Sequence, residues 1–301
     1  MELGVELKPD RPFYEIEYLA KIAEDYRYDY IWITEHYNNR NPIPILTSIA
    51  LKTNRAKIGV GATNPYTTHP ALIASTAFTL DEISGGRAVL AISAGDKMTL
   101  NSLGIKREKA LKTVREAVEL IKALMIGKTY EGEIFKCYGI IPFARSIPIF
   151  VGAQGEKMIK LALEVGDGVI LNATLPKIKT DKIVGLCMPV CVDEDIDRAK
   201  RIAKIVVAFI IAGSSRNFAE KRGIPFDEVL RIREKISKGK FDELQIKEEL
   251  IEDFCIYGSV RDVVSRIESL DVDLFVVGTP IGRDKVKAIK EIGKRIKGVS
   301  K

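Results

Sequence analysis

The sequence predicts an α/β protein, and a TIM-type (β/α)8 barrel is the architecture that it favours. Short apolar runs alternate with longer amphipathic stretches along the 301 residues, which is the pattern of a parallel sheet whose strands are joined by helices. Eight such runs are present, and the first begins at residue 3. A chain of this length is common for a single barrel domain. A doubly wound open sheet is the alternative architecture.

The expected elements alternate between strand and helix. The strands are expected at residues 3–7, 30–34, 57–61, 88–93, 149–152, 168–172, 184–192 and 274–278. Helices are expected between most of them, at residues 13–26, 70–83 and 107–125, with another beginning near Glu156. The helix at 107–125 has one apolar stripe with a spacing of three or four residues, formed by Leu111, Val114, Val118, Ile121 and Met125.

Two connections depart from the regular repeat. Residues 172–182 leave little room for a helix, because a crossover between parallel strands usually needs about a dozen residues or more. We therefore expect one barrel helix to be reduced or missing there. Residues 194–269 are too long for one crossover, and they contain helical patterns at 196–212, 215–222, 226–237 and 243–254. Since no repeat or linker interrupts the chain, we expect a single domain over residues 1–301 with a helical insertion at about 194–269.

The composition is that of an ordinary soluble globular protein, with 46% hydrophobic and 29% charged residues. The longest apolar run, residues 205–213, is too short to cross a bilayer, and the first residues do not resemble a signal peptide. We therefore expect a cytoplasmic protein without membrane contact. The net charge of +6 comes from Lys and Arg that are interleaved with Glu. Nucleic acid is therefore not an expected partner, whereas an anionic small molecule is favoured.

Polar residues stand at the carboxyl ends of most expected strands, where α/β barrels place their catalytic groups. His36 could act as a base or donate to the edge of a ring, although a lone His beside an acidic residue is more often structural. Asp96 could bind a hydroxyl or amide edge, or pair with Lys97. Glu119 lies one residue off the apolar stripe of its helix, so on the residues alone it is a solvated side chain. The strand-end residues are Glu6, Glu35, His36, Thr63, Asn64, Asp96, Gln154 and Asn172.

Glu6 is the most unusual of these residues. It stands between Val5 and Leu7 in a strand pattern, so its side chain points to the opposite face from theirs. On either face of a barrel strand a buried carboxylate is costly unless it has a use. Partial desolvation would raise its pKa and let it donate a proton near neutral pH. A Glu at the strand end that turns into solvent is the alternative.

Glycines mark two further strand ends. Gly61-Ala62 ends a strand and leads directly into Thr63-Asn64-Pro65-Tyr66; glycine there indicates a bulge or a close approach to the backbone. Gly152-Ala153-Gln154-Gly155 lies between a strand and a helix, where backbone N–H groups can face an anion. Each segment alone is more simply an ordinary turn. Together with the other strand ends, the first segment suggests one wall of a ligand site at the barrel mouth. The second segment suggests an anion site there.

The sequence lacks the motifs of several common kinds of catalytic site. It has only two histidines, His36 and His69, and four cysteines without a framework spacing, so a Cys/His metal site is not expected. It contains no P-loop, no GxGxxG fingerprint and no GxSxG elbow. Carboxylates, amides and glycines around a barrel mouth suit a bound organic cofactor better.

The chain resembles the methylenetetrahydromethanopterin reductases, which are members of the luciferase-like superfamily. The resemblance runs from Leu3-Gly4-Val5-Glu6 to Gly278-Thr279-Pro280-Ile281-Gly282, and its most specific segments are residues 32–41, 63–66, 152–155 and 206–210. It implies a TIM-type barrel with an inserted helical segment, and a homo-oligomer, either a dimer or a tetramer. It also implies coenzyme F420, a deazaflavin hydride carrier, and reduction of 5,10-methylenetetrahydromethanopterin to the 5-methyl form in archaeal one-carbon metabolism or methanogenesis.

The resemblance also implies roles for individual residues. Glu6 would be the acid that protonates the pterin nitrogen, with Asp96 and Glu119 as supporting polar residues. The Gly61–Ala62 peptide would be cis and lie behind the deazaflavin ring. The coenzyme phosphate would be held by Gly152, Ala153, Gln154 and Gly155, and the remaining coenzyme contacts would come from Glu35, His36, Thr63, Asn64 and Asn172.

The chain also departs from the family pattern. Glu35 stands where the family usually has Asp, Ser93-Ala94-Gly95-Asp96 replaces a more usual Gly-Pro-Gly-Asp, and the segments at 137–145 and 172–182 are shorter than usual. These differences bear more on the substrate than on the cofactor. The alternatives are another F420- or FMN-dependent luciferase-like oxidoreductase, and a relative that binds the coenzyme without catalysis.

Overall fold

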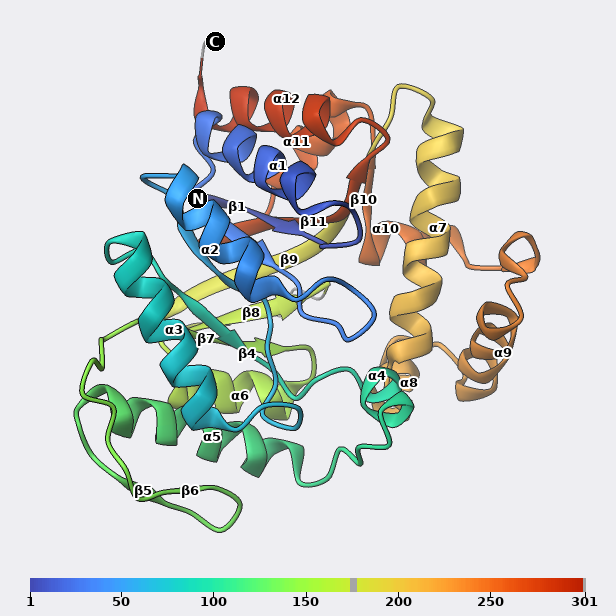
Figure 1. Cartoon of the computed structure of the whole chain (residues 1–301). Helices are drawn as coiled ribbons and strands as arrows, with labels where there is room; N and C mark the ends of the chain where they lie inside the picture. Colours follow the sequence, from blue (N-terminus) through green and yellow to red (C-terminus); the bar gives the residue numbers. More distant parts are fainter. Residues whose placement is uncertain (174–177, 300–301) are drawn as a thin grey trace.

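The fold is a closed barrel of eight parallel strands surrounded by helices (Figure 1). The structure is a computed structural model that describes residues 1–173 and 178–299. Two parallel bridges, Ile58 to Ala88 and Thr63 to Ile92, close the barrel between its third and fourth strands. The barrel strands are β1 (Glu2–Leu7), β2 (Tyr30–Ile33), β3 (Lys57–Val60), β4 (Leu90–Ile92), β7 (Ile149–Ala153), β8 (Gly168–Asn172), β9 (Ile183–Val192) and β11 (Leu274–Gly282).

The predicted barrel is therefore confirmed, and its strands lie where the apolar runs placed them. The largest difference is at β11, which continues beyond residue 278 to Gly282. The register between β11 and β9 shifts between Gly278 and Ile281, so the strand passes through an irregularity before it pairs again. This extension carries Thr279 to the carboxyl end of the barrel.

Helices cover the outside of the barrel. The layer includes α1 (Phe13–Asp25), α2 (Pro42–Lys52), α3 (Pro70–Ser84), α5 (Ala110–Met125), α6 (Glu156–Val165), α11 (Val260–Glu268) and α12 (Lys285–Lys297). In α5 the expected stripe packs inward through Val114, Val118 and Ile121, which are fully buried. Leu111 in contrast is exposed, and the helix begins at Ala110 because Lys109 has a left-handed φ of 46°. No helix of the described residues is long and apolar enough to cross a membrane.

The interior of the barrel is filled by aromatic and aliphatic side chains. Trp32 and Phe150 pack edge to face with their ring centroids 5.9 Å apart, and Tyr30 stacks on Trp32 at the same separation. Val276 and Leu274 of β11 belong to the same buried cluster. Because these side chains fill the lumen, a ligand can enter only at one of its ends, and the polar strand ends lie at the carboxyl end.

The helical insertion forms a second core beside the barrel (Figure 1). It consists of α7 (Ile196–Gly213), α8 (Arg216–Lys221), α9 (Phe226–Ser237), a 3-10 turn (Phe241–Glu243) and α10 (Glu248–Phe254). The short strand β10 (Ile256–Gly258) follows and pairs with β9. Helix α11 packs on the barrel core through Val263 and Ile267, so it is a regular barrel helix. The insertion thus ends near residue 255, before the expected boundary at 269.

The remaining connections are short. Between β8 and β9, residues 178–182 contain no helix, and residues 174–177 lie outside the described part of the chain. A small hairpin, β5 (Tyr130–Glu131) with β6 (Lys136–Cys137), and the short helix α4 (Lys97–Ser102) complete the described elements. The sequence pattern did not predict either of them.

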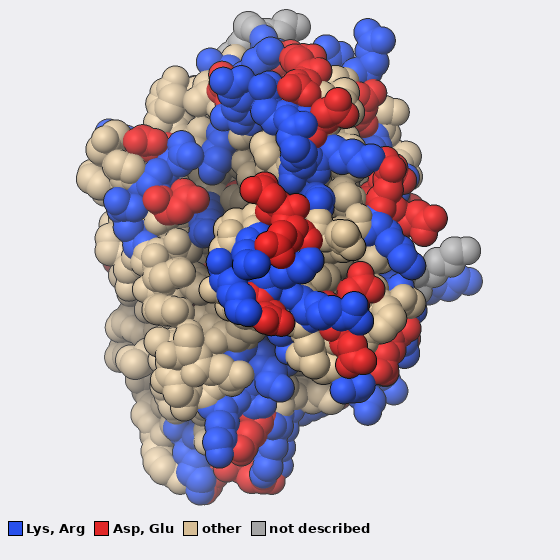
Figure 2. Space-filling view, turned by 90° about the vertical axis from the view of Figure 1, so that its right-hand side faces the viewer, with Lys and Arg blue, Asp and Glu red and all other residues tan. Residues whose placement is uncertain are grey.

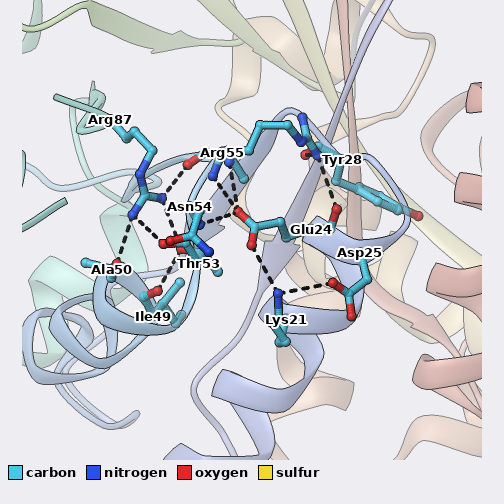
Figure 3. A network of polar contacts seen from close by, with 11 residues as sticks. Lys21, Glu24, Asp25, Tyr28, Ile49, Ala50, Thr53, Asn54, Arg55 and Arg87 are labelled. Carbon is cyan, nitrogen blue, oxygen red and sulfur yellow. Dashed lines mark hydrogen bonds and ion pairs between the residues drawn. The ribbon is translucent and has the colours of Figure 1, made fainter. Parts of the chain in front are cut away.

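A buried ionic network holds the amino ends of the strands together (Figure 3). One carboxylate oxygen of Glu24 accepts the backbone N–H groups of Asn54, Arg55 and Ala56, at 2.8, 2.7 and 3.1 Å. The guanidinium of Arg87 donates to carbonyl oxygens of the same loop and of α2. Burial works to raise the pKa of Glu24, but these N–H groups and Lys21 leave it lowered. This end of a barrel serves stability, and the opposite end serves chemistry.

Candidate active site

Glu6 points into the lumen at the carboxyl end of β1. Val5 and Leu7 pack against the helix layer, so the alternation of the strand turns Glu6 to the other side. Its Oε2 accepts the backbone N–H of Thr279 at 3.2 Å and the hydroxyl of Thr279 at 3.4 Å. Burial raises the pKa of Glu6, and the two Thr279 donors and the charge of Lys8 offset this only in part. Glu6 is thus a carboxyl group that keeps its proton to a higher pH than an ordinary glutamate.

A half-buried thiol lies beside Glu6. Burial raises the pKa of the Cys187 thiol well above its usual range, and the charge of Glu6 adds to the shift. Cys187 is in β9, next to Asn172 at the end of β8. Because the thiol is neutral, it adds no charge to the site. Glu6 is therefore the group that titrates at this side of the barrel mouth.

The backbone conformation at the end of β3 is the one that the resemblance implied. The Gly61–Ala62 peptide is cis, and a second cis peptide joins Thr279 to Pro280. A Cβ at Gly61 would lie 2.9 Å from the Cβ of Trp32 and 3.0 Å from its Cε3. Glycine is therefore required here, because the chain passes directly over the indole ring. Thr63 is buried and links this segment to β4 by backbone hydrogen bonds with Ala91 and Ser93.

Three buried polar atoms near the end of β2 have no hydrogen-bond partner among the described residues. They are the indole Nε1 of Trp32, the hydroxyl of Thr34 and the Oε2 of Glu35. Buried donors and acceptors in folded proteins are nearly always paired. A ring with carbonyl and N–H groups at its edge would pair with them, so the residues present fit a deazaflavin at this place.

His36 and Asp96 are brought together by a third residue, Thr99. The Nε2 of His36 lies 2.6 Å from the hydroxyl of Thr99, which also lies 2.8 Å from a carboxylate oxygen of Asp96. Asp96 caps α4 by accepting the N–H of Thr99 at 2.7 Å, and it forms no ion pair with Lys97 among the described residues. The other ring nitrogen of His36 contacts Asn38 at 2.6 Å. The loops after β2 and β4 are thus joined on one side of the mouth.

Asn64 has a partly structural role. Its side-chain oxygen accepts the N–H groups of Tyr66 and Thr67, each at 3.1 Å, so it fixes the turn that follows β3. Its side chain also packs against Gly95, where a Cβ would lie 3.2 Å from the Cγ of Asn64. Only the amide nitrogen of Asn64 is left to contact a ligand.

The turn after β7 leads into α6, as expected. Gly155 precedes the helix without a side-chain cap, and a Cβ there would meet nothing within 4 Å. A Cβ at Gly152 would lie 3.1 Å from that of Ser93, so the turn is open to solvent at Gly155 and closely packed at Gly152. Gln154 is half-buried and Ala153 is buried. Glu156 pairs with Lys221 of α8 at 2.7 Å, so the insertion reaches this turn.

Glu119 is not brought to this group. Its carboxylate accepts the hydroxyl of Tyr130 at 2.9 Å and lies 3.7 Å from Arg115, which also pairs with Glu164 of α6. These partners belong to the helix layer and to the β5–β6 hairpin. Glu119 therefore has the solvated position that the helix pattern alone suggested, and the supporting role that the resemblance implied stays a prediction.

Sequence reasoning missed Thr99 and Thr279. Thr279 stands in the segment that carried the resemblance, but its contact with Glu6 joins residues 273 positions apart. Thr99 could have been found as the third residue of a helix capped by Asp96, since such a residue donates its N–H to the cap. Its contact with His36 gives no signal in the sequence.

Comparison with known proteins assigns the family. The sequence profile of the luciferase-like monooxygenases matches residues 1–275. The 5,10-methylenetetrahydromethanopterin reductase of Archaeoglobus fulgidus is 46% identical over 98% of this chain and 98% of its own length. The alignment spans 327 positions, more than the 301 residues of this chain, so that relative has residues which this chain lacks. The reductase of that name from Methanolobus tindarius is 40% identical over 99% of this chain and 100% of its own length.

Solved structures agree with the sequence comparison. The coenzyme F420-dependent tetrahydromethanopterin reductase of Methanopyrus kandleri has a TM-score of 0.87 and 37% identity, with 97% of each chain covered. An F420-dependent secondary alcohol dehydrogenase has a TM-score of 0.81 at 17% identity, which reflects the shared fold. On these findings the chain belongs to the luciferase-like family and, within it, to the 5,10-methylenetetrahydromethanopterin reductases.

Proposed function

We propose that this protein transfers a hydride from reduced coenzyme F420 to 5,10-methylenetetrahydromethanopterin and releases the 5-methyl form. The observation that carries the proposal is the half-buried Glu6, whose pKa is raised by burial at the mouth of a barrel that is shared with reductases of this name. A protonated carboxyl near neutral pH is what the reaction needs, because a pterin nitrogen gains a proton as the methylene bridge opens.

The residues near Glu6 support this role. The proton of Glu6 passes to the nitrogen that leaves the bridge, the C–N bond breaks, and the methylene carbon becomes an iminium ion on the other nitrogen. That carbon then accepts a hydride, which is the chemistry that F420 supplies when bound. The carboxylate that remains accepts the N–H and hydroxyl of Thr279, so its charge is stabilised until solvent returns a proton.

The coenzyme would be held by groups from several strand ends. The buried unpaired atoms of Trp32, Thr34 and Glu35 would pair with the edge of the deazaflavin. Gly61 and Ala62 would lie behind the ring. The open turn at Gly155, at the amino end of α6, would receive the phosphate, because free N–H groups at a helix start favour an anion. His36, Asn64 and Asn172 would complete the site.

Two further properties are proposed, the first from the resemblance to this family and the second from the sequence. We propose a homo-oligomer, as a dimer or a tetramer, and a cytoplasmic location. Light scattering of the purified protein measures the first, and fractionation of the source cells measures the second.

An anaerobic assay tests the proposed reaction. Purified protein is mixed with reduced F420 and 5,10-methylenetetrahydromethanopterin, the deazaflavin absorbance is followed, and the pterin product is identified by mass spectrometry. We expect oxidation of F420 matched by one 5-methyl product per hydride. Binding of F420 without turnover would contradict the proposed function, and so would turnover that depends on FMN instead of F420.

A further inference from the structure

A cavity of ≈ 620 Å³ lies at the rim of the barrel, and the proposed reaction does not use it. It opens between the amino ends of α1, α7 and α12, beyond the carboxyl ends of β9 and β11. Figure 2 faces the side on which α7 and the amino end of α12 lie, and Lys and Arg side chains gather in its upper part with Asp and Glu among them. We call this cavity the rim pocket and define it by Arg11, Asp193, Arg198, Arg283 and Lys285.

Part of the positive charge of the rim pocket is neutralised within the protein. Arg198 donates two hydrogen bonds of 2.6 Å to the carboxylate of Asp193, and this contact lowers the pKa of Asp193. Arg11 donates to Glu15 at 3.3 Å. Among the described residues, however, neither Arg283 nor Lys285 forms an ion pair. Glu194 and Asp284 also line the pocket, and the charge of Arg283 acts on Asp193 from a longer distance.

Within the part of the chain that the structure describes, Lys285 lacks an ion-pair partner in surroundings where an unpaired positive charge is unfavourable. Lys285 is half-buried. Its pKa is lowered by burial, then by the positive charge of Arg11 and least by that of Lys8, while Asp10 acts in the opposite direction. The Nε of Arg11 is buried without a hydrogen-bond partner among the described residues, with Asp10 at 3.6 Å. Cations that a fold brings together in a partly desolvated place repel one another more than in water. A bound anion would remove that cost.

We propose that the rim pocket binds a phosphate or carboxylate group, held by Lys285, Arg283 and the guanidinium of Arg11. The pocket lies beside β9 and β11, whereas the turn proposed for the coenzyme phosphate follows β7, with β8 between β7 and β9. It is therefore a second anion site. The proposal rests on the charges of the pocket and does not depend on the proposed hydride transfer.

Calorimetry tests the site without any turnover. The full-length protein, in a buffer free of phosphate and carboxylates, is titrated with inorganic phosphate and separately with citrate. We expect saturable binding of at least one of them, and about tenfold weaker binding by Lys285→Met, because a charge-assisted contact is lost. Lys290→Met is the matched control, since Lys290 lies in the same helix but over the ring of Tyr26. Failure of the wild type to bind either anion, or equal binding by Lys285→Met, would overturn the proposal.

Thermal unfolding gives an independent check, because loss of the Lys285 side chain is expected to raise the unfolding temperature. Lys285→Met should unfold at a higher temperature than the wild type in the anion-free buffer, because one repelling charge is removed. The wild type should gain thermal stability when the anion is added, and Lys285→Met should gain much less. An equal gain in both proteins would contradict the site.

Steady-state kinetics then identifies the source of the anionic group. A higher KM for F420 or for the pterin in Lys285→Met than in Lys290→Met assigns the group to that substrate. Unchanged KM values together with lost phosphate or citrate binding assign it to a separate anion. If the wild type shows no hydride transfer, the proposed function fails, but the calorimetric result still decides the rim pocket.

Discussion

The carboxylate of Glu6 is paired with Thr279 across the junction of β1 and β11, where the backbone N–H donates at 3.2 Å and the hydroxyl at 3.4 Å. The two strands are neighbours, and Val5 stands opposite Val277. The proposed acid is therefore oriented by the strand beside it. Burial raises the pKa of Glu6 while Thr279 lowers it, so the balance between them sets the pH at which the acid loses its proton.

Removing the hydroxyl of Thr279 should move the pH profile. Thr279→Val keeps the shape and the backbone N–H but loses one donor to the carboxylate, so the pKa of Glu6 should rise further. The acid form then persists to higher pH, and the alkaline limb of kcat/KM should shift upward. Thr279→Ser, which retains the hydroxyl, is the control. An alkaline limb that stays in place in Thr279→Val would show that Thr279 does not tune this group.

Gly61→Ala should damage the site through packing. The new Cβ would lie 2.9 Å from the Cβ of Trp32, so the chain or the indole must move, and overpacking of this kind costs about 1–3 kcal/mol. We expect a lower unfolding temperature and weaker F420 binding, measured by calorimetry and fluorescence titration. Gly139→Ala is the control, because a Cβ there meets nothing within 4 Å. Unchanged F420 affinity in Gly61→Ala would contradict the placement of the ring at this wall.

Gly155→Asp should separate helix stability from coenzyme binding. Asp is a better helix cap than glycine, so α6 should not lose stability. The added negative charge should repel the coenzyme phosphate and weaken F420 binding about tenfold, or about 1.4 kcal/mol. Gly155→Asn adds a cap of the same size without the charge and should bind F420 nearly as well as the wild type. Equal F420 affinities of the Asp and Asn variants would place the phosphate elsewhere.

Glu24 should contribute to stability in a pH-dependent way. Its pKa is lowered from the ordinary value of 4.5 in the folded protein, so its contribution is present above that value and is lost as the pH falls through the folded-state pKa. Glu24→Ala leaves the N–H groups of Asn54, Arg55 and Ala56 without this acceptor, which should cost about 3 kcal/mol at neutral pH.

The control for Glu24 is Glu24→Gln, which keeps an acceptor oxygen but loses the charge. Its difference from the wild type, followed by urea unfolding from pH 7 downward, should shrink as the wild-type carboxylate becomes protonated. A difference that grows toward acid pH would contradict the lowered pKa. Hydride transfer at neutral pH should remain in Glu24→Gln, since Glu24 lies at the amino end of the barrel.

The sequence was sufficient to predict what depends on local pattern. Apolar runs of the right length located the barrel strands, and the alternation of Val5, Glu6 and Leu7 correctly turned the acid away from the side that its neighbours face. The length of the segment at 194–269 revealed an insertion. Its end was placed too late, because the helical pattern of α11 resembles those of the inserted helices although it packs on the barrel.

Contacts between distant loops could not be predicted from the sequence. His36 and Thr99 are 63 positions apart and meet only because the loops after β2 and β4 converge at the barrel mouth. The strand β10 has only three residues, too few for an apolar run to stand out within a helical region. Glu119 was assigned to the site through the family resemblance, whereas the helix pattern had already placed it among solvated residues.

The most direct test of the proposed acid is Glu6→Gln, with Glu2→Gln as its matched control. Glu2 lies on the same strand at the amino end, where it accepts the hydroxyl of Tyr30 at 3.2 Å. In Glu6→Gln we expect kcat to fall about 10²–10⁴-fold, with F420 affinity unchanged and thermal stability at pH 7 raised.

The rise in stability follows from the sign of the pKa shift. A carboxyl group whose pKa is raised by folding destabilises the folded state once the pH exceeds its ordinary value of 4.5, because the unfolded chain releases the proton first. Glutamine removes this titration. The decisive measurement is therefore the rate of anaerobic hydride transfer from reduced F420 to 5,10-methylenetetrahydromethanopterin in the wild type, Glu6→Gln and Glu2→Gln. The proposal predicts that only Glu6→Gln loses turnover, and full turnover in Glu6→Gln would contradict it.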